Sequence, residues 1–132
     1  MKNYEEINFE NKKNIKCLID AESDKYIAKV KIADDFKSRL LGLMFKKDID
    51  YPLLFIIPNR LKYRERSSIH SFFMRFELVL VFIDEENTVF EIVELKPWSY
   101  HSPKKSSKYI IEFKKDNFKE YNIKIGDKIK LK

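Results

Sequence analysis

The chain has 132 residues, a single cysteine and a formal net charge of +6. This length predicts one domain, residues 1–132. The lone cysteine excludes an intramolecular disulfide framework and a cysteine-rich zinc site.

Alternation of apolar and polar residues predicts a mainly β chain. In residues 26–32, for example, apolar side chains at every second position alternate with Ile27, Lys29 and Lys31, which is typical of a half-buried strand. Residues 1–13 are polar and are expected to fray. In chain order, the predicted strands are 14–19, 26–32, 53–57, 68–76, 78–83, 88–95, 109–113 and 128–131.

Turns and helices complete this pattern. Residues 84–87 carry turn-forming side chains, so the strands on either side of them should form a hairpin. A short helix is predicted from Asp34 or Asp35 to about Met44, one helical turn at 118–121, and a polar connection at 98–107. The expected fold is therefore a β-sandwich of jelly-roll type, or a partly closed barrel, with one or two short helices.

The positive charge is concentrated in the middle of the chain. Residues 36–75 alone carry +6, whereas residues 1–35 carry −1 and residues 76–132 carry +1. Arginine binds phosphate and carboxylate in a bidentate manner, which makes an anionic partner such as nucleic acid one interpretation of the segment 60–75. A solvated loop is the interpretation the sequence favours, because lysine outnumbers arginine 22 to 5 along the whole chain. The candidate anion-binding residues are Arg60, Arg64, Arg66 and Arg75.

Three stretches, in this order and spacing, resemble a known family. They are Arg39-Leu40-Leu41-Gly42-Leu43-Met44, then Ile69-His70-Ser71-Phe72-Phe73-Met74-Arg75-Phe76, then Leu95-Lys96-Pro97-Trp98 with Tyr109-Ile110-Ile111-Glu112 and Gly126-Asp127. Over about residues 28–131 the chain is similar to domain-of-unknown-function family 192. The resemblance implies a β-sandwich-like domain and no particular activity. Val79 stands where the family usually has an aspartate, which puts that part of any family site in doubt.

The tentative ligand-binding residues come from these stretches. His70 can exchange a proton near neutral pH, although a histidine at the edge of the core is the favoured interpretation. Glu112 is expected to be half-buried in its strand and so to need a partner, for which Arg39 is the candidate. A purely structural Arg39–Glu112 bridge is the alternative. The full set of candidate residues is Arg39, His70, Met74, Trp98 and Glu112.

The sequence contains no phosphate-binding loop, dinucleotide fingerprint or nucleophile elbow. It therefore favours a non-catalytic domain that binds a small or anionic ligand. The alternatives are a nucleic-acid or protein interaction module that uses residues 60–75, and an enzyme with His70 and Glu112 as acid and base. No cofactor and no metal are predicted, partly because His101 is expected to be solvated in a loop.

The location of the protein follows from its apolar runs. The longest of them, residues 78–83, is far shorter than the ~20 residues of a membrane-spanning helix. The N-terminus also lacks the apolar segment of a secretory signal. A cytoplasmic protein without a membrane partner is the expectation.

Overall fold

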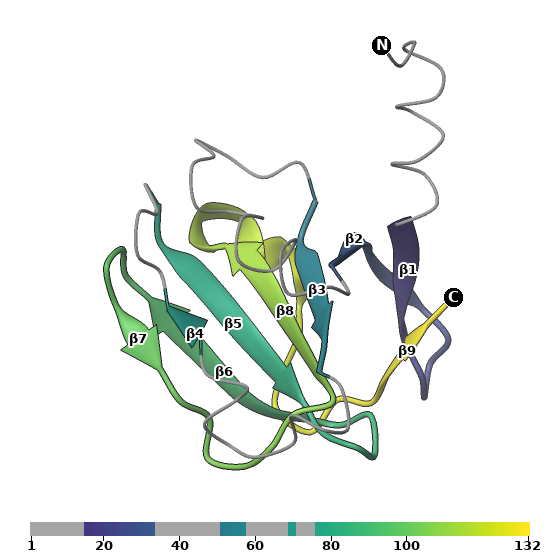
Figure 1. Ribbon diagram of the computed structural model, residues 1–132. Coiled ribbons are helices and arrows are strands. Elements are labelled where there is room, and N and C mark those ends of the chain that lie inside the picture. The colour runs from purple at the N-terminus through teal and green to yellow at the C-terminus, as the bar shows by residue number, and fades with distance from the viewer. Residues whose placement is uncertain (1–14, 34–50, 58–68, 71–75) are drawn as a thin grey trace, which may run out of the picture.

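The computed structural model describes residues 15–33, 51–57, 69–70 and 76–132, which form two β-sheets (Figure 1). The predicted mainly β class is confirmed. The elements are β1 (Ile15–Asp20), β2 (Tyr26–Ala33), β3 (Leu53–Ile56), β4 (Ile69–His70), β5 (Leu78–Ile83), β6 (Val89–Leu95), β7 (Tyr100–His101), β8 (Tyr109–Lys114), the 3₁₀ helix η3 (Lys115–Tyr121) and β9 (Ile129–Leu131).

Seven strands form one mixed sheet in the order β6-β5-β8-β3-β2-β1-β9. All neighbours are antiparallel except β2 and β3. The edge strands β6 and β9 approach each other at one end, where Thr88 and Lys128 form an isolated bridge and the Val89 amide donates to the Asp127 carbonyl at 2.9 Å. The sheet is therefore curled, and its two edges meet at that end without closing into a full barrel.

The inner face of the curled sheet carries the larger hydrophobic cluster. Every one of the seven strands contributes to it, as expected when a sheet wraps around its own core. Phe118 and Tyr121 of η3 pack against this cluster. Its buried members are Leu18, Val30, Leu54, Val79, Val81, Ile83, Val89, Ile111, Phe113, Ile123 and Ile129.

The outer face carries a second cluster, built on β3, β8, β5 and β6. The strand β5 is buried on both faces, which explains its uninterrupted apolar sequence. The short sheet β4–β7 packs on this outer face, because the His101 ring of β7 lies 5.6 Å from the Phe82 ring of β5. The buried members are Leu53, Phe55, Ile57, Leu78, Leu80, Phe82, Phe90, Leu95 and Ile110.

Most predicted elements are present in the described residues. The 78–83 and 88–95 hairpin is confirmed as β5–β6, with a bulge between Phe82 and Ile83 of the register. The predicted helical turn is η3, which begins three residues earlier.

One other prediction was wrong, and others fall partly or wholly outside the described residues. The polar connection 98–107 contains the strand β7, so the prediction of a plain loop there was wrong. Of the predicted strand 68–76, only β4 and Phe76 are described. The predicted helix from Asp34 or Asp35 to about Met44 and the fraying of residues 1–13 lie outside the described residues.

The helix η3 has seven residues. Among the described parts of the chain, no helix has the length and apolar character that crossing a membrane requires.

Candidate functional site

Glu112 lies near the middle of the outer face and is only 5% exposed. Its backbone pairs with Leu53 of β3 on one side and Leu80 of β5 on the other. Paired residues of neighbouring strands point to the same face, so the carboxylate is surrounded by apolar side chains of the outer cluster. The burial predicted for Glu112 is confirmed and is deeper than expected. Burial of a carboxylate in such a place is costly without hydrogen-bonding or charged partners, and Glu112 does have an interaction partner.

A carboxylate–imidazole pair lies at the β6 side of the same face. The Nε2 atom of His101 is 2.5 Å from Oε2 of Glu91, and the Lys104 amide donates to Oε1 of Glu91 at 3.1 Å. Glu91 faces outward because it pairs with Phe82, while Phe90 is the extra residue of the bulge. Both carboxylate oxygens of Glu91 are therefore engaged, and the His101 ring is held in one orientation.

This pair fixes the tautomer of His101. An ionised Glu91 only accepts hydrogen bonds, so a neutral His101 carries its proton on Nε2 and presents Nδ1 as an acceptor. Chemically the pair can accept a hydrogen bond or a proton, and structurally it holds β7 against β6. The expectation that His101 is solvated in a loop was wrong, because the chain folds back over β6 after residue 98.

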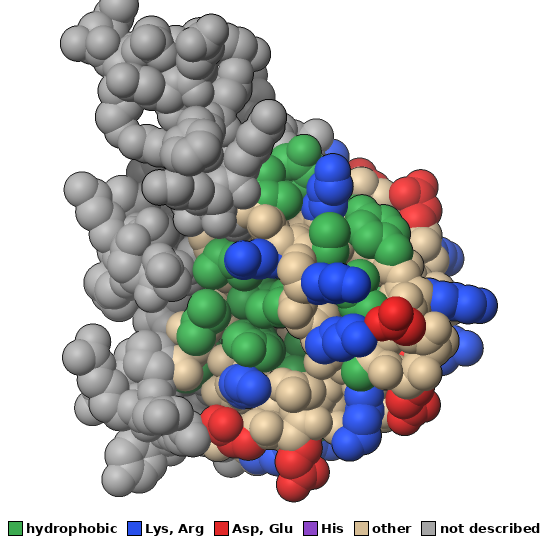
Figure 2. Space-filling view, turned by 90° about the vertical axis from the view of Figure 1, so that its right-hand side faces the viewer, with side chains coloured by type: hydrophobic (Ala, Val, Ile, Leu, Met, Phe, Trp, Pro, Cys, Tyr) green, Lys and Arg blue, Asp and Glu red, His purple; other side chains and the backbone are tan. Residues whose placement is uncertain are grey.

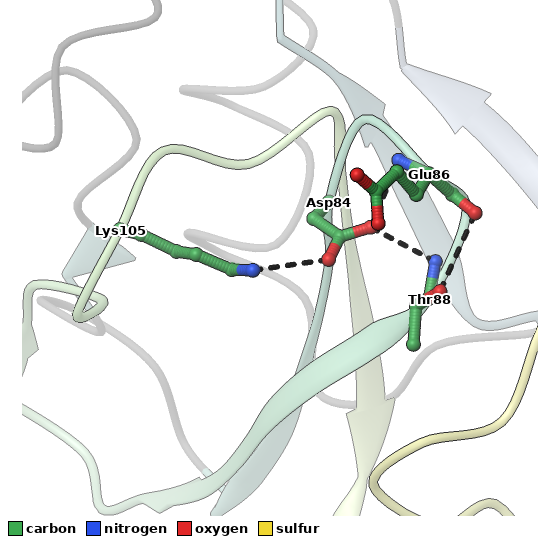
Figure 3. Close-up of polar contacts among 4 residues, drawn as sticks. All are labelled: Asp84, Glu86, Thr88 and Lys105. Atoms are coloured by element: carbon green, nitrogen blue, oxygen red, sulfur yellow. Dashed lines mark hydrogen bonds and ion pairs between the residues drawn. The ribbon is translucent and has the colours of Figure 1, made fainter.

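Asp84 joins the segment after β7 to the β5–β6 hairpin (Figure 3). Its Oδ1 atom accepts the amides of Glu86 and Thr88 at 2.9 and 3.1 Å, and its Oδ2 atom pairs with Nζ of Lys105 at 3.0 Å. Burial alone would raise the pKa of Asp84, but the hydrogen bonds from Thr88, Lys105 and Glu86 outweigh it and lower the pKa below 3.8. Asp84 is therefore ionised at neutral pH and stabilises this end of the outer face.

Two aromatic side chains are exposed where the chain leaves β6. Trp98 is 61% exposed and Tyr100 is 62% exposed. Trp98 also has a φ of 60°, whereas the other non-glycine residues with positive φ in the described parts are Asp or Asn. For a bulky side chain this backbone conformation is strained, and such strain gathers at binding and catalytic sites. An exposed, strained tryptophan therefore marks this turn as a candidate contact.

We expect Trp98→Gly to be more stable than Trp98→Ala by about 1 kcal/mol. Both substitutions remove the exposed ring, but only glycine adopts a positive φ without a steric cost. Urea unfolding of the two variants measures the difference. Equal stabilities would show that the turn relaxes and stores no strain.

The structure places part of the predicted site on one face. The strand β4 holds the backbone of His70 opposite Tyr100, and β4–β7 packs on the face that carries Glu112. Trp98 lies two residues before the first residue of β7. The remaining predicted residues lie outside the described residues: Arg39, Met74, Arg60, Arg64, Arg66 and Arg75.

Sequence reasoning missed Glu91 and His101. The available signal was an acidic residue between the apolar pairs Val89-Phe90 and Ile92-Val93 of a predicted strand. Among the described residues, no group of three or more His, Cys, Asp or Glu side chains is arranged to hold a metal ion.

The described residues thus define a mainly β domain with a curled seven-stranded sheet and a polar site on its outer face. Two solved structures share this fold. One, from Sinorhizobium meliloti with a proposed role as a transcription regulator, has a TM-score of 0.71, 22% identity, and coverage of 89% of this chain and 92% of its own. The other, a protein of unknown function from Novosphingobium aromaticivorans, has a TM-score of 0.70, 16% identity, and coverage of 88% and 83%.

The chain belongs to domain-of-unknown-function family 192 (DUF192), described as "Uncharacterized ACR, COG1430", whose family model matches residues 18–131. Relatives include the UPF0127 protein of Pyrococcus horikoshii, 44% identical over 101 residues, which are 76% of this chain and 85% of the relative. The UPF0127 protein of Pyrococcus abyssi is 36% identical over 110 residues, 83% of this chain and 92% of the relative. The predicted family resemblance is confirmed, and the match begins ten residues earlier than predicted.

Proposed function

We propose that this protein is a non-catalytic domain that binds a small ligand on the outer face of its sheet. The observation that carries the proposal is Glu112, a carboxylate that is 5% exposed and lies between the buried side chains of Leu53 and Leu80. A mostly apolar lining with a few fixed polar groups is the usual composition of a small-molecule site. Glu112 already has an interaction partner within the protein, and its carboxylate has enough lone pairs to accept a further hydrogen bond from a donor group of the ligand.

Two further features on this face support the proposal. Glu91 and His101 supply a second oriented polar group, and the exposed ring of Trp98 supplies an aromatic surface. An anionic group on the ligand would need Arg39 or His70, and that part of the proposal rests on the sequence alone. Cytoplasmic location is likewise proposed from the sequence.

Acid–base catalysis is a second candidate because of one observation, the Glu91–His101 pair. A histidine oriented by a carboxylate is a common arrangement for a general base. In this candidate function His101 is the acid–base residue, in place of the His70 predicted from the sequence. The nucleic-acid alternative through residues 60–75 gains no support from the Sinorhizobium meliloti structure, because likeness at 22% identity shows the fold alone.

The test is a thermal-shift screen of wild-type protein and Glu112→Gln against a library of small metabolites. We expect at least one compound to raise the melting temperature of the wild type, since a ligand that binds only the native state stabilises it. The same compound should lose most of its effect on Glu112→Gln, which keeps the shape of the side chain and removes its charge. Glu94→Gln, an exposed position on β6, is the matched control and should respond like the wild type.

A hit that acts equally on Glu112→Gln and on Trp98→Ala would place the ligand elsewhere and contradict the proposed site. A compound consumed by the wild type but not by a His101→Gln variant would favour the enzymatic candidate instead.

A further inference from the structure

A second surface lies on the other half of the sheet, where β1 runs between β2 and β9. Figure 2 looks at the molecule from this side and shows apolar side chains lying among lysines. In the register, Ile15 pairs with Lys31 and Cys17 with Lys29 across β1–β2. On the other side of β1, Ile19 pairs with Lys130, and Cys17 and Lys132 exchange backbone hydrogen bonds of 3.0 and 2.9 Å.

These pairs place seven residues on the outward side of the three strands. Leu18, Val30 and Leu131 point the other way, into or against the inner cluster. The outward side is therefore an apolar row along β1 with a pair of lysines on each flank. We call it the lysine-flanked stripe, and its residues are Ile15, Cys17, Ile19, Lys29, Lys31, Lys130 and Lys132.

The stripe is positively charged, and its apolar row is partly accessible. Lys29, Lys130 and Lys132 are exposed, Lys31, Ile15 and Cys17 are half-buried, and Ile19 is buried. Asp24 forms an ion pair with Lys130 and also attracts Lys132, so the positive charge that Asp24 does not offset lies mainly on Lys29 and Lys31. Positive charge on both sides of an apolar row is complementary to a partner with an apolar seam and acidic flanks.

The spacing of the strands selects the shape of this partner. The two lysine rows are separated by two strand spacings, about 10 Å, which matches the diameter of an α-helix, about 10 Å. A single extended strand would occupy about half of that width and would leave one lysine row without a partner. Along each row, alternate residues repeat about every 7 Å, close to the i, i+4 spacing of a helix, about 6 Å.

We propose that the lysine-flanked stripe is a docking surface for an acidic amphipathic helix of a partner protein, whose apolar seam lies along β1. This inference is independent of the proposed ligand site, because it uses β1, β2 and β9, and the ligand site uses β3, β5, β6, β7 and β8. Either proposal can fail without affecting the other.

The experiment measures fluorescence anisotropy of a labelled peptide of about 18 residues, or ~5 helical turns, against the full chain. Its leucines recur at i, i+3, i+4 and i+7 and glutamates occupy both flanks. A peptide of the same composition in scrambled order, polyglutamate, and an oligothymidine of about 20 nucleotides are the comparison probes. We expect the amphipathic peptide to bind more tightly than all three, and to weaken as salt rises from about 0.05 to about 0.5 M.

Two double variants change the stripe itself, and a third, outside the stripe, is their control. Lys29→Glu with Lys31→Glu should weaken the amphipathic peptide about tenfold. Lys119→Glu with Lys124→Glu makes the same charge change at exposed positions outside the stripe and should leave binding nearly unchanged. Ile15→Ser with Cys17→Ser should weaken the amphipathic peptide and leave polyglutamate binding unchanged.

Three results would overturn the proposal: no binding of the amphipathic peptide, equal binding of the scrambled peptide, or tighter binding of oligothymidine. The first would leave the stripe a solvated surface, the second would make it a general polyanion site, and the third would assign it to nucleic acid.

Discussion

Phe113→Ala should destabilise the protein by about 3 to 5 kcal/mol, the largest effect we expect from a single substitution. Phe113 is fully buried on the inner face of the sheet. Its ring lies 5.1 Å from the ring of Phe118 and 4.9 Å from that of Tyr121. Alanine would leave a cavity between β8 and η3 and would remove both ring contacts. A domain of ordinary stability, about 5 to 15 kcal/mol, would lose a large part of its free energy of unfolding.

Urea unfolding followed by circular dichroism measures this loss as a lower midpoint at unchanged slope. Phe118→Ala is the control, because Phe118 is half-buried at the edge of the same cluster. We expect it to cost about 1 to 2 kcal/mol. Equal effects of the two substitutions would mean that η3 does not cover the inner cluster as the structure shows.

Asp84→Ala should cost about 2 kcal/mol near neutral pH, the next largest effect. The substitution removes two hydrogen bonds from backbone amides and the contact with Lys105. The side chain of Asp84 is only 13% exposed, so water replaces these bonds incompletely. The turn of the β5–β6 hairpin and the segment after β7 should loosen together.

The contribution of Asp84 to the free energy of unfolding also depends on pH, and the direction of this dependence follows from its pKa. Its pKa in the folded protein lies below the usual value of 3.8, so the unfolded chain binds the proton more readily. The stabilisation is therefore fully present above about pH 4 and is lost as the pH falls through the lower, folded-state pKa. Unfolding midpoints measured from about pH 7 to about pH 2 should fall less steeply for Asp84→Asn than for the wild type.

Asp20→Asn is the control for this series. Asp20 accepts the amides of Glu22 and Ser23 in an exposed turn, and hydrogen bonds from the Ser23 and Glu22 backbone lower its pKa. Solvent screens this turn, so the loss of charge should matter less there. A steeper acid dependence for Asp84→Asn than for the wild type would contradict the lowered pKa of Asp84.

The sequence by itself determined the strands whose side chains repeat at a clear period. The apolar run 78–83 and the turn residues after it predicted β5 and the β5–β6 hairpin, because local periodicity reports burial on one or both faces. Burial of Glu112 could also be predicted, since its neighbours on β8 are apolar. The family was recognisable from ordered short stretches, although each stretch alone is weak.

Only the tertiary structure decided how these strands combine into a site. The pairing of Glu91 with His101 depends on one bulge residue, Phe90, and on a chain reversal after Trp98 that no periodic pattern reports. Likewise, the lysine-flanked stripe brings residues of β1 and β2 together with residues at the far end of the sequence, because β9 pairs with β1. Periodicity describes which face a side chain takes within its own strand, whereas the neighbours of that strand are set by packing over the whole sheet.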